Sequence, residues 1–353
     1  MRILLFHKGG IGDVVFVLPL VRDLRQGYPR AEITALTHDN GREVLRFCPH
    51  LDGVLSVSSS PDAWSVREAK RVLAGKRFDI AMTSAHSLRA AYLLSLVGAR
   101  TRVGFSTFPE RLFFTHQAKV APFEVVFARR YQRLAEALGL PIGDAIPRLT
   151  IPDEQLDLAR SRLAARGWDT HCALIGLHIG AGWPTKKWPV ENIAELIRAA
   201  AERYRAQVLL QGGADDSARA KEILRHVPGE AVIDSVGNPI SHALSEAALC
   251  RVVVGLDTGL THAAAACGVP TVCLFGPTDE HSIAPSFHQH VLTRDLYCRP
   301  CNRAGRFRCP EGHHRCMREL HARDVLELIA SHLSDSEKNA KIQARPSGSS
   351  ALT

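Results

Sequence analysis

No stretch of this 353-residue chain is both long enough and apolar enough for a transmembrane helix. The N-terminus, MRILLFHKGG, has an apolar run of only four residues, so we interpret it as a first strand and not as a secretory signal. The sequence also lacks a basic patch interleaved with aromatic residues, which argues against a nucleic-acid partner. These absences predict a cytoplasmic protein whose contact with a membrane is at most peripheral.

What the chain does contain is the composition of a globular protein, with 46% hydrophobic and 23% charged residues. Its length suits two domains, each able to bury its own core. The net charge of +8 favours an anionic partner such as a nucleotide, a phosphorylated glycolipid or a membrane surface. A generic basic surface is the alternative explanation of that charge.

Predicted strands and helices alternate along nearly the whole chain, which predicts an α/β protein with parallel sheets covered on both faces. A segment rich in proline and glycine, Pro141–Pro152, marks a boundary between residues 1–150 and 151–335. Residues 336–353 form a polar tail typical of disorder. We therefore expect two Rossmann-like, doubly wound domains that face a central cleft lined by the carboxyl ends of their strands.

The first domain is expected to begin with a strand and to alternate from there. The expected strands are Arg2–Phe6, Glu32–Leu36, Val54–Val57, Asp79–Thr83 and Thr101–Gly104. The expected helices are Val14–Arg25, Arg42–Phe47, Pro61–Ala74, Leu88–Val97 and Phe123–Leu138. Pro19 is expected to make the first of these helices kinked or irregular. Glu110–Val120 has no clean period, and we expect a loop over the domain opening.

The second domain repeats the alternation. Its expected strands are Ala173–Ile179, Gln207–Gln211, Val232–Ser235, Val252–Val254, Pro270–Phe275 and residues 291–292. Its expected helices are Asp153–Arg166, Val190–Tyr204, Ser217–His226, Ile240–Cys250, Thr261–Ala266 and Ala322–Leu333.

The first glycine-rich turn, Lys8–Asp13, reads KGGIGD and lacks the G-x-G-x-x-G pattern of a dinucleotide site. A carboxylate follows Gly12, where it would repel a phosphate. Asp13 therefore has two interpretations, a helix cap or a general base held at the cleft by the glycine turn.

Two later turns suit a nucleotide phosphate. Small residues, Thr185 and two lysines precede a helix after the strand ending at Ile179, which fits a phosphate cradle or a surface turn with solvated lysines. In DTGLTH, Asp257 to His262, Thr258 and Gly259 open a helix whose N–H groups suit pyrophosphate. Asp257 is otherwise a cap, and His262 is otherwise a helix histidine with satisfied hydrogen bonds.

A third turn, QGGADD at Gln211–Asp216, ends a strand. Gly213 permits close approach of a ligand, and Asp215 or Asp216 has an acceptor for a ribose or a base. The alternative is that one of these aspartates only caps the next helix.

Four of the nine cysteines lie close together late in the chain. Their spacing is Cys298-x2-Cys301-x7-Cys309-x6-Cys316, with two histidines before the last. Four thiols at such spacing can form a structural zinc site, and free thiols are the alternative. We include no metal ligand among the predicted site residues.

Together these segments resemble glycosyltransferase family 9, the ADP-heptose:lipopolysaccharide heptosyltransferases. The resemblance covers residue 1 to about residue 333 and is carried by GIGDVV, by K-x-W-P at Lys186–Pro189, by GGADD, and by DTGLTHAAAACGVPTVCLFGPT. It implies a GT-B fold, which consists of two Rossmann-like domains.

The resemblance also implies roles for the site residues. Asp13, beside Gly12, would be the general base on the acceptor hydroxyl, and Lys186 would bind the donor phosphate. The other implied donor-binding residues are Thr185, Gly213, Asp216, Asp257, Thr258, Gly259 and His262. Arg111 and Lys119 lie in the half where the family binds its acceptor, although a solvated basic face explains them equally well.

The expected reaction is an inverting transfer of a heptose from an ADP-sugar to an anionic glycolipid, the inner core of lipopolysaccharide. The expected protein is a monomer with peripheral contact to the cytoplasmic face of the inner membrane. No D-x-D motif stands beside the donor turns, which fits a reaction without a divalent metal or another cofactor.

Other functions remain open from the sequence. The donor could be another nucleotide sugar, or the chain could bind a nucleotide sugar or a glycolipid without catalysis. A nucleotide-sugar epimerase or dehydrogenase is a further alternative. The missing G-x-G-x-x-G, and the absence of Y-x-x-x-K on a matching helix, argue against the dehydrogenase.

Overall fold

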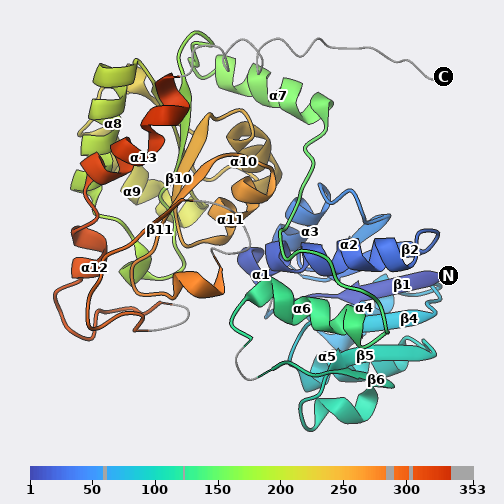
Figure 1. Ribbon diagram of the computed structural model, residues 1–353. Coiled ribbons are helices and arrows are strands. Elements are labelled where there is room, and N and C mark those ends of the chain that lie inside the picture. Colours follow the sequence, from blue (N-terminus) through green and yellow to red (C-terminus); the bar gives the residue numbers. More distant parts are fainter. Residues whose placement is uncertain (59–61, 122–123, 284–289, 302–304, 335–353) are drawn as a thin grey trace. The chain divides into compact units, whose positions relative to one another are not determined.

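The computed structural model describes residues 1–58, 62–121, 124–283, 290–301 and 305–334. The chain divides into two compact units, 1–150 with the described part of 281–288, and 151–280 with the described residues from 290 onward. Each unit carries one six-stranded parallel sheet with helices packed on it (Figure 1). The predicted polar tail, 336–353, lies outside the described residues. Among the described residues, no helix has the length and apolarity that crossing a membrane requires.

The first unit has the strand order β3-β2-β1-β4-β5-β6. Its strands are β1 Arg2–Phe6, β2 Glu32–Thr37, β3 Gly53–Ser56, β4 Ile80–Thr83, β5 Thr101–Phe105 and β6 His116–Ala118. Its helices are α1 Ile11–Phe16, α2 Leu18–Gly27, α3 Asp39–Leu45, α4 Val66–Val72, α5 Leu88–Leu96 and α6 Phe127–Glu136, with a 3₁₀ helix η1 at Glu110–Phe113.

The structure differs from two expectations for this unit. The segment 110–120, predicted as a loop, contains η1 and the edge strand β6. The single helix predicted over Val14–Arg25 is two helices, α1 and α2, that meet at Val17. Pro19 lies in the first turn of α2, where its missing N–H has no intrahelical partner to lose.

The second unit has the order β12-β11-β10-β7-β8-β9. Its strands are β7 Leu174–His178, β8 Gln207–Gln211, β9 Val232–Asp234, β10 Val252–Leu256, β11 Thr271–Leu274 and β12 His290–Leu292. Its α-helices are α7 Asp153–Ala164, α8 Val190–Tyr204, α9 Ser217–Leu224, α10 Ile240–Ala247, α11 Gly259–Ala266, α12 Arg315–Arg318 and α13 Ala322–Ser334. Its 3₁₀ helices are η2 Pro184–Lys186, η3 Ala214–Asp216 and η4 Gly229–Ala231, while η5 Glu280–Ser282 lies where the chain passes from the second unit into the segment assigned to the first.

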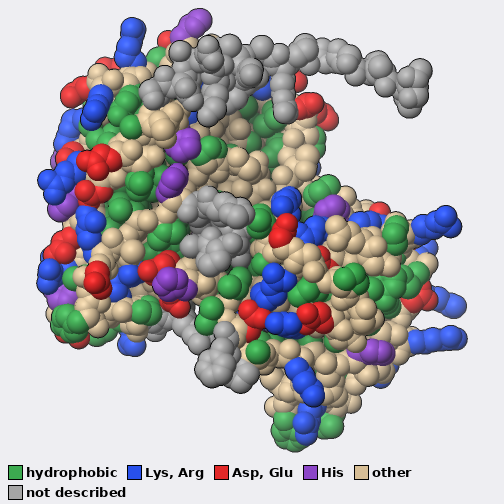
Figure 2. Space-filling view, in the orientation of Figure 1, with side chains coloured by type: hydrophobic (Ala, Val, Ile, Leu, Met, Phe, Trp, Pro, Cys, Tyr) green, Lys and Arg blue, Asp and Glu red, His purple; other side chains and the backbone are tan. Residues whose placement is uncertain are grey.

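Both orders, counted within each unit, are the 3-2-1-4-5-6 order of a Rossmann sheet. The strands are buried on both faces, as β10 illustrates. Val252 and Val254 pack into one core with residues of α8 and α13, while Val253 packs into another with residues of α7 and α11. This two-sided burial explains the continuous β-branched run in the sequence and confirms the doubly wound α/β class. Figure 2 shows charged side chains spread over the surface of both units.

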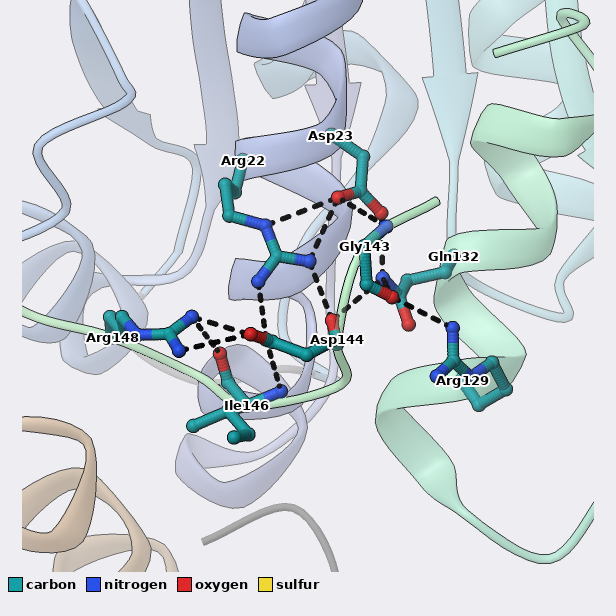
Figure 3. Close-up of polar contacts among 8 residues, drawn as sticks. All are labelled: Arg22, Asp23, Arg129, Gln132, Gly143, Asp144, Ile146 and Arg148. Carbon is teal, nitrogen blue, oxygen red and sulfur yellow. Dashed lines mark hydrogen bonds and ion pairs between the residues drawn. The ribbon is translucent and has the colours of Figure 1, made fainter. Parts of the chain in front are cut away.

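A network of hydrogen bonds and ion pairs holds residues 143–144, close to the end of the first unit, against its helices (Figure 3). Asp23 on α2 is fully buried, and its carboxylate accepts hydrogen bonds from Arg22 at 2.9 Å and from Gln132 on α6 at 2.6 Å. It also accepts from the N–H of Gly143 at 3.2 Å, and Arg22 donates to Asp144 at 2.5 Å. Residues 143–144 are therefore tied to both α2 and α6.

Candidate functional site

In a Rossmann sheet, the chain winds in opposite directions from the two central strands, and ligands bind beyond the carboxyl ends of those strands. In the first unit the central strands are β1 and β4, which are followed by His7 and Ser84. Nδ1 of His7 lies 2.5 Å from the Ser84 hydroxyl, so a hydrogen bond joins the two strand ends. Burial, with a smaller contribution from His38, lowers the pKa of His7 to about 3, so its ring is neutral.

Asp13 lies at the same strand ends, in the first turn of α1. Its Oδ2 accepts a hydrogen bond from the N–H of Gly10 at 3.0 Å, and its Oδ1 accepts one from the Tyr131 hydroxyl at 3.3 Å. Burial raises the pKa of Asp13, although both hydrogen bonds act in the opposite direction. The carboxylate thus satisfies an N–H at the helix start and is also a stronger base than an exposed aspartate.

Two adjacent glycines offer a matched test of this geometry. A Cβ on Gly9 would lie 2.3 Å from Cβ of Asp13, whereas a Cβ on Gly10 would come no closer to Asp13 than 3.8 Å, to its Oδ2. On the sequence prediction that Asp13 is a general base, we expect Gly9→Ala to displace it and to lower kcat at least about tenfold, since small misplacements of such a base are costly. Gly10→Ala is expected to keep nearly the wild-type kcat. Steady-state kinetics would check this, and equal activities of the two variants would contradict it.

The predicted acceptor residues lie in two places within the first unit. Gly12 lies beside Asp13 in α1. Arg111 is exposed in η1, with its guanidinium 5.7 Å from the centre of the Phe108 ring, and Lys119 is exposed directly after β6. Within the part of the chain that the structure describes, no hydrogen bond or ion pair joins either cation to Asp13.

In the second unit the central strands are β7 and β10, and a buried ion pair connects the turns that follow them. Nζ of Lys186 donates to Oδ2 of Asp257 at 2.6 Å and to its carbonyl oxygen at 3.0 Å. Asp257 also accepts from Nε2 of His262 at 3.0 Å and from the Thr278 hydroxyl at 2.7 Å. Burial alone would raise the pKa of Asp257, but His262 and Lys186 outweigh it and hold that pKa well below its ordinary value.

This lowered pKa predicts a pH dependence of stability. A carboxyl whose pKa is lower in the folded state contributes stability above its unfolded pKa of about 3.9, and that stability is lost as the pH falls. We therefore expect the free energy of unfolding of the wild type to fall more steeply between about pH 5 and 3 than that of Asp257→Asn. Urea unfolding across this range would check it, and parallel pH profiles would contradict it.

The N-terminus of α11 lies beside this ion pair. Thr258 is the N-cap, and within the described residues its side chain makes no capping hydrogen bond, while Gly259 begins the helix. The helix start thus presents backbone N–H groups and the positive end of the helix dipole next to the ammonium group of Lys186. This arrangement suits a phosphate group.

Sequence reasoning missed a buried polar chain below this helix. Nδ1 of His178 lies 3.1 Å from the Thr261 hydroxyl, and its Nε2 lies 2.9 Å from Oε1 of Gln211. The amide of Gln211 donates to the carbonyl of Ala243 at 2.9 Å. His178 and Gln211 close the apolar strands β7 and β8, and a polar residue at a strand end is the one signal that marked them. This series of hydrogen bonds holds Thr261 in the first turn of α11.

Asp216 lies in a separate cluster of the second unit. Its carboxylate accepts from Lys187 at 2.9 Å and from the N–H of Gly213 at 3.2 Å. A Cβ on Gly180 would lie 2.3 Å from Oδ2 of Asp216, so the glycine allows the carboxylate to reach this turn. Asp216, Gly213 and the Gly180 turn are thereby brought together.

The Thr185 hydroxyl makes hydrogen bonds within the protein. It donates to the carbonyl of Arg306 at 2.7 Å and accepts from the N–H of that residue at 2.8 Å. Nε2 of His314 donates to the carbonyl of Thr185 at 2.7 Å. The turn that carries Lys186 is therefore anchored to the cysteine-rich segment.

All four late cysteines, Cys298, Cys301, Cys309 and Cys316, line one cavity of about 140 Å³. Burial raises the pKa of Cys316 to about 11 and raises that of Cys301, so both are protonated thiols at neutral pH. Across the described ranges, no group of three or more His, Cys, Asp or Glu residues has the arrangement of a metal site.

The family model described as "Glycosyltransferase family 9 (heptosyltransferase)" matches residues 66–309. The chain is 27% identical over 316 residues to lipopolysaccharide heptosyltransferase 1 of Pseudomonas aeruginosa, covering 85% of this chain and 86% of that protein.

Solved structures agree on the fold. An Escherichia coli ADP-heptose LPS heptosyltransferase II superposes with a TM-score of 0.79 at 23% identity, covering 96% of this chain and 100% of the other. An E. coli heptosyltransferase solved with ADP gives a TM-score of 0.69 at 20% identity, covering 95% and 99%. These matches confirm the expected two-domain fold of the GT-B type.

Proposed function

Because this chain belongs to glycosyltransferase family 9, we propose that it transfers a heptose from ADP-heptose to the inner core of lipopolysaccharide, with inversion at the anomeric carbon. The observation that carries the proposal is the placement of Lys186 and the start of α11 at the central strand ends of the second sheet. A fixed cation and a helix N-terminus are what a departing nucleotide diphosphate needs. The relatives described above are heptosyltransferases, and one of them was solved with ADP. Both facts support the choice of donor.

We propose that the second unit binds the donor. Lys186 and the N–H groups at Thr258–Gly259 stabilise the negative charge that grows on the leaving diphosphate. The carboxylate of Asp257 holds the ammonium group of Lys186 in place at 2.6 Å. Asp216 accepts a hydrogen bond from the nucleoside.

The first unit holds the acceptor in this proposal. Asp13 takes the proton of the acceptor hydroxyl while that oxygen attacks the anomeric carbon of the donor. Its raised pKa suits this role, because a base is most effective when its pKa approaches the working pH. Gly12 lets the acceptor approach α1, and Arg111 and Lys119 attract its anionic groups.

The chemistry assigned to Lys186 and α11 does not require a divalent metal, and we propose metal-independent transfer. The acceptor is part of a glycolipid, so we place the protein at the cytoplasmic face of the inner membrane, in peripheral contact and as a monomer. A glycosyltransferase that uses another nucleotide sugar is the alternative function.

A thermal-shift panel of nucleotides and nucleotide sugars tests the donor. A ligand that binds only the folded protein raises its melting temperature with concentration. We expect ADP and ADP-heptose to raise the Tm, and UDP, GDP and their sugars to leave it unchanged. If only a nucleotide sugar with another base raised the Tm, that sugar would be the donor and the proposal of ADP-heptose would be wrong.

A further inference from the structure

Exposed hydrophobic side chains gather at one end of the first unit. The described residues contain ten large hydrophobic side chains that are exposed, and five of them fall between residues 88 and 112. These five are Leu88, Tyr92, Leu96, Phe108 and Leu112. In Figure 2, hydrophobic side chains cover the end of the first unit at which the segment 105–115 lies in Figure 1, and Lys and Arg side chains lie next to them.

The exposed side chains lie on two neighbouring elements. Leu88, Tyr92 and Leu96 follow one another at intervals of four residues, so they lie along one face of α5. The opposite face of α5 is buried in the core, including Leu93 and Leu94. The Tyr92 ring contacts the ring of Phe113 in η1, with their centres 6.3 Å apart, which places the α5 stripe beside the helix that carries Leu112. The stripe therefore does not serve the core of this unit.

The part of the chain that carries the patch is strongly basic. Residues 1–150 contain 21 Lys and Arg against 13 Asp and Glu, so they carry the entire net charge of +8, while residues 151–353 contain 23 of each. Between residues 66 and 112 there are nine Lys and Arg and three Asp and Glu. Two of those carboxylates are used locally, since Glu68 binds the N–H and hydroxyl of Ser65, and Asp79 accepts from the N–H of Arg2.

We propose that this surface, formed by α5 and the segment 105–112, docks on an anionic lipid bilayer. Leucine and aromatic side chains enter the boundary between headgroups and acyl chains, while surrounding Lys and Arg side chains meet the anionic headgroups. The Arg111 guanidinium, stacked on the Phe108 ring, places cation and apolar surface side by side. The inference extends the proposed function, because docking would hold the first unit where a lipid-linked acceptor is displayed.

Vesicle flotation of the full chain tests the docking surface. The vesicles contain phosphatidylethanolamine and phosphatidylglycerol without any glycolipid acceptor, and vesicles of phosphatidylcholine are the neutral reference. We expect binding to the anionic vesicles only, weakened by salt. The double variant Tyr92→Ser/Leu112→Ser is expected to lower the partition coefficient at least about tenfold, because two exposed side chains lose their insertion.

A matched control has the same two substitutions outside the patch. Leu158 and Tyr297 are 47% and 82% exposed in the second unit, so Leu158→Ser/Tyr297→Ser is expected to float like the wild type. Circular dichroism verifies that both variants fold. Arg100 is exposed between α5 and β5, and Arg100→Glu supplies a second patch variant that replaces a positive charge with a negative one. Equal flotation of the patch variants and the control would overturn the proposal. A concentration-dependent dimer in sedimentation that only the patch variants abolish would assign the surface to self-association instead.

Transfer to a delipidated, water-soluble acceptor separates this inference from the proposed function. The patch variant is expected to keep wild-type turnover on that acceptor and to lose turnover on the vesicle-bound glycolipid. If the wild type floats but transfers no sugar to either acceptor, the proposed function fails and the docking surface stands.

Discussion

Replacing Asp13 with alanine is expected to lower the rate of heptose transfer by about 10²–10⁴-fold, the usual contribution of a general base. The reason is that Asp13 is the carboxylate at the central strand ends of the first sheet, with a pKa raised by burial. Binding of ADP-heptose is expected to stay within about twofold of wild type, because the donor residues belong to the other unit. Single-turnover kinetics and donor titrations would measure both quantities.

The controls for this prediction separate catalysis from capping. Asp13→Asn keeps an oxygen that accepts from the Gly10 N–H, but its amide cannot take a proton from the acceptor. This variant is therefore expected to fold normally and to transfer heptose as slowly as Asp13→Ala. Asp157→Asn changes an exposed carboxylate of the second unit and is expected to have wild-type activity. Normal turnover by Asp13→Asn would reduce Asp13 to a structural role.

Replacing Lys186 with alanine is expected to weaken ADP binding by about tenfold to a hundredfold, since a hydrogen bond to a charged group contributes roughly 1.5–3 kcal/mol. The same change removes a partner from the buried carboxylate of Asp257, so the free energy of unfolding falls as well. Calorimetry with ADP and urea unfolding would measure the two effects.

A second substitution distinguishes these two effects. In Lys186→Ala/Asp257→Asn, the buried charge is gone, so stability is expected to return toward the wild type while ADP affinity stays low. Lys221→Ala, on the exposed face of α9, serves as the neutral control. Unchanged ADP affinity in Lys186→Ala would restrict the residue to holding Asp257.

Much of the fold could be predicted because most strands are buried on both faces and therefore appear as apolar runs. Val252–Leu256 and Gln207–Gln211 are examples. The strand β6 could not be predicted in this way, since His116 and Gln117 are exposed and the strand lies at the edge of the sheet beside β5. The division of α1 from α2 was also missed, because Pro19 is compatible with a kink and with a helix start alike.

The candidate site was predicted less completely than the fold. The glycine turns and their side chains could be located, because turns after strands carry recognisable residues. The pairing of Lys186 with Asp257 could not be predicted, since it joins residues 71 positions apart and depends on the neighbouring positions of β7 and β10. Tyr131, which donates to Asp13 from α6, gave no signal within an amphipathic helix.

The most direct test of the account combines the protein, ADP-heptose and a delipidated lipopolysaccharide core that lacks its heptose. The account predicts that ADP is released in step with a gain of one heptose residue by the core, with inverted configuration at the anomeric carbon. ADP release no faster than without the core, or retention of configuration, would contradict it.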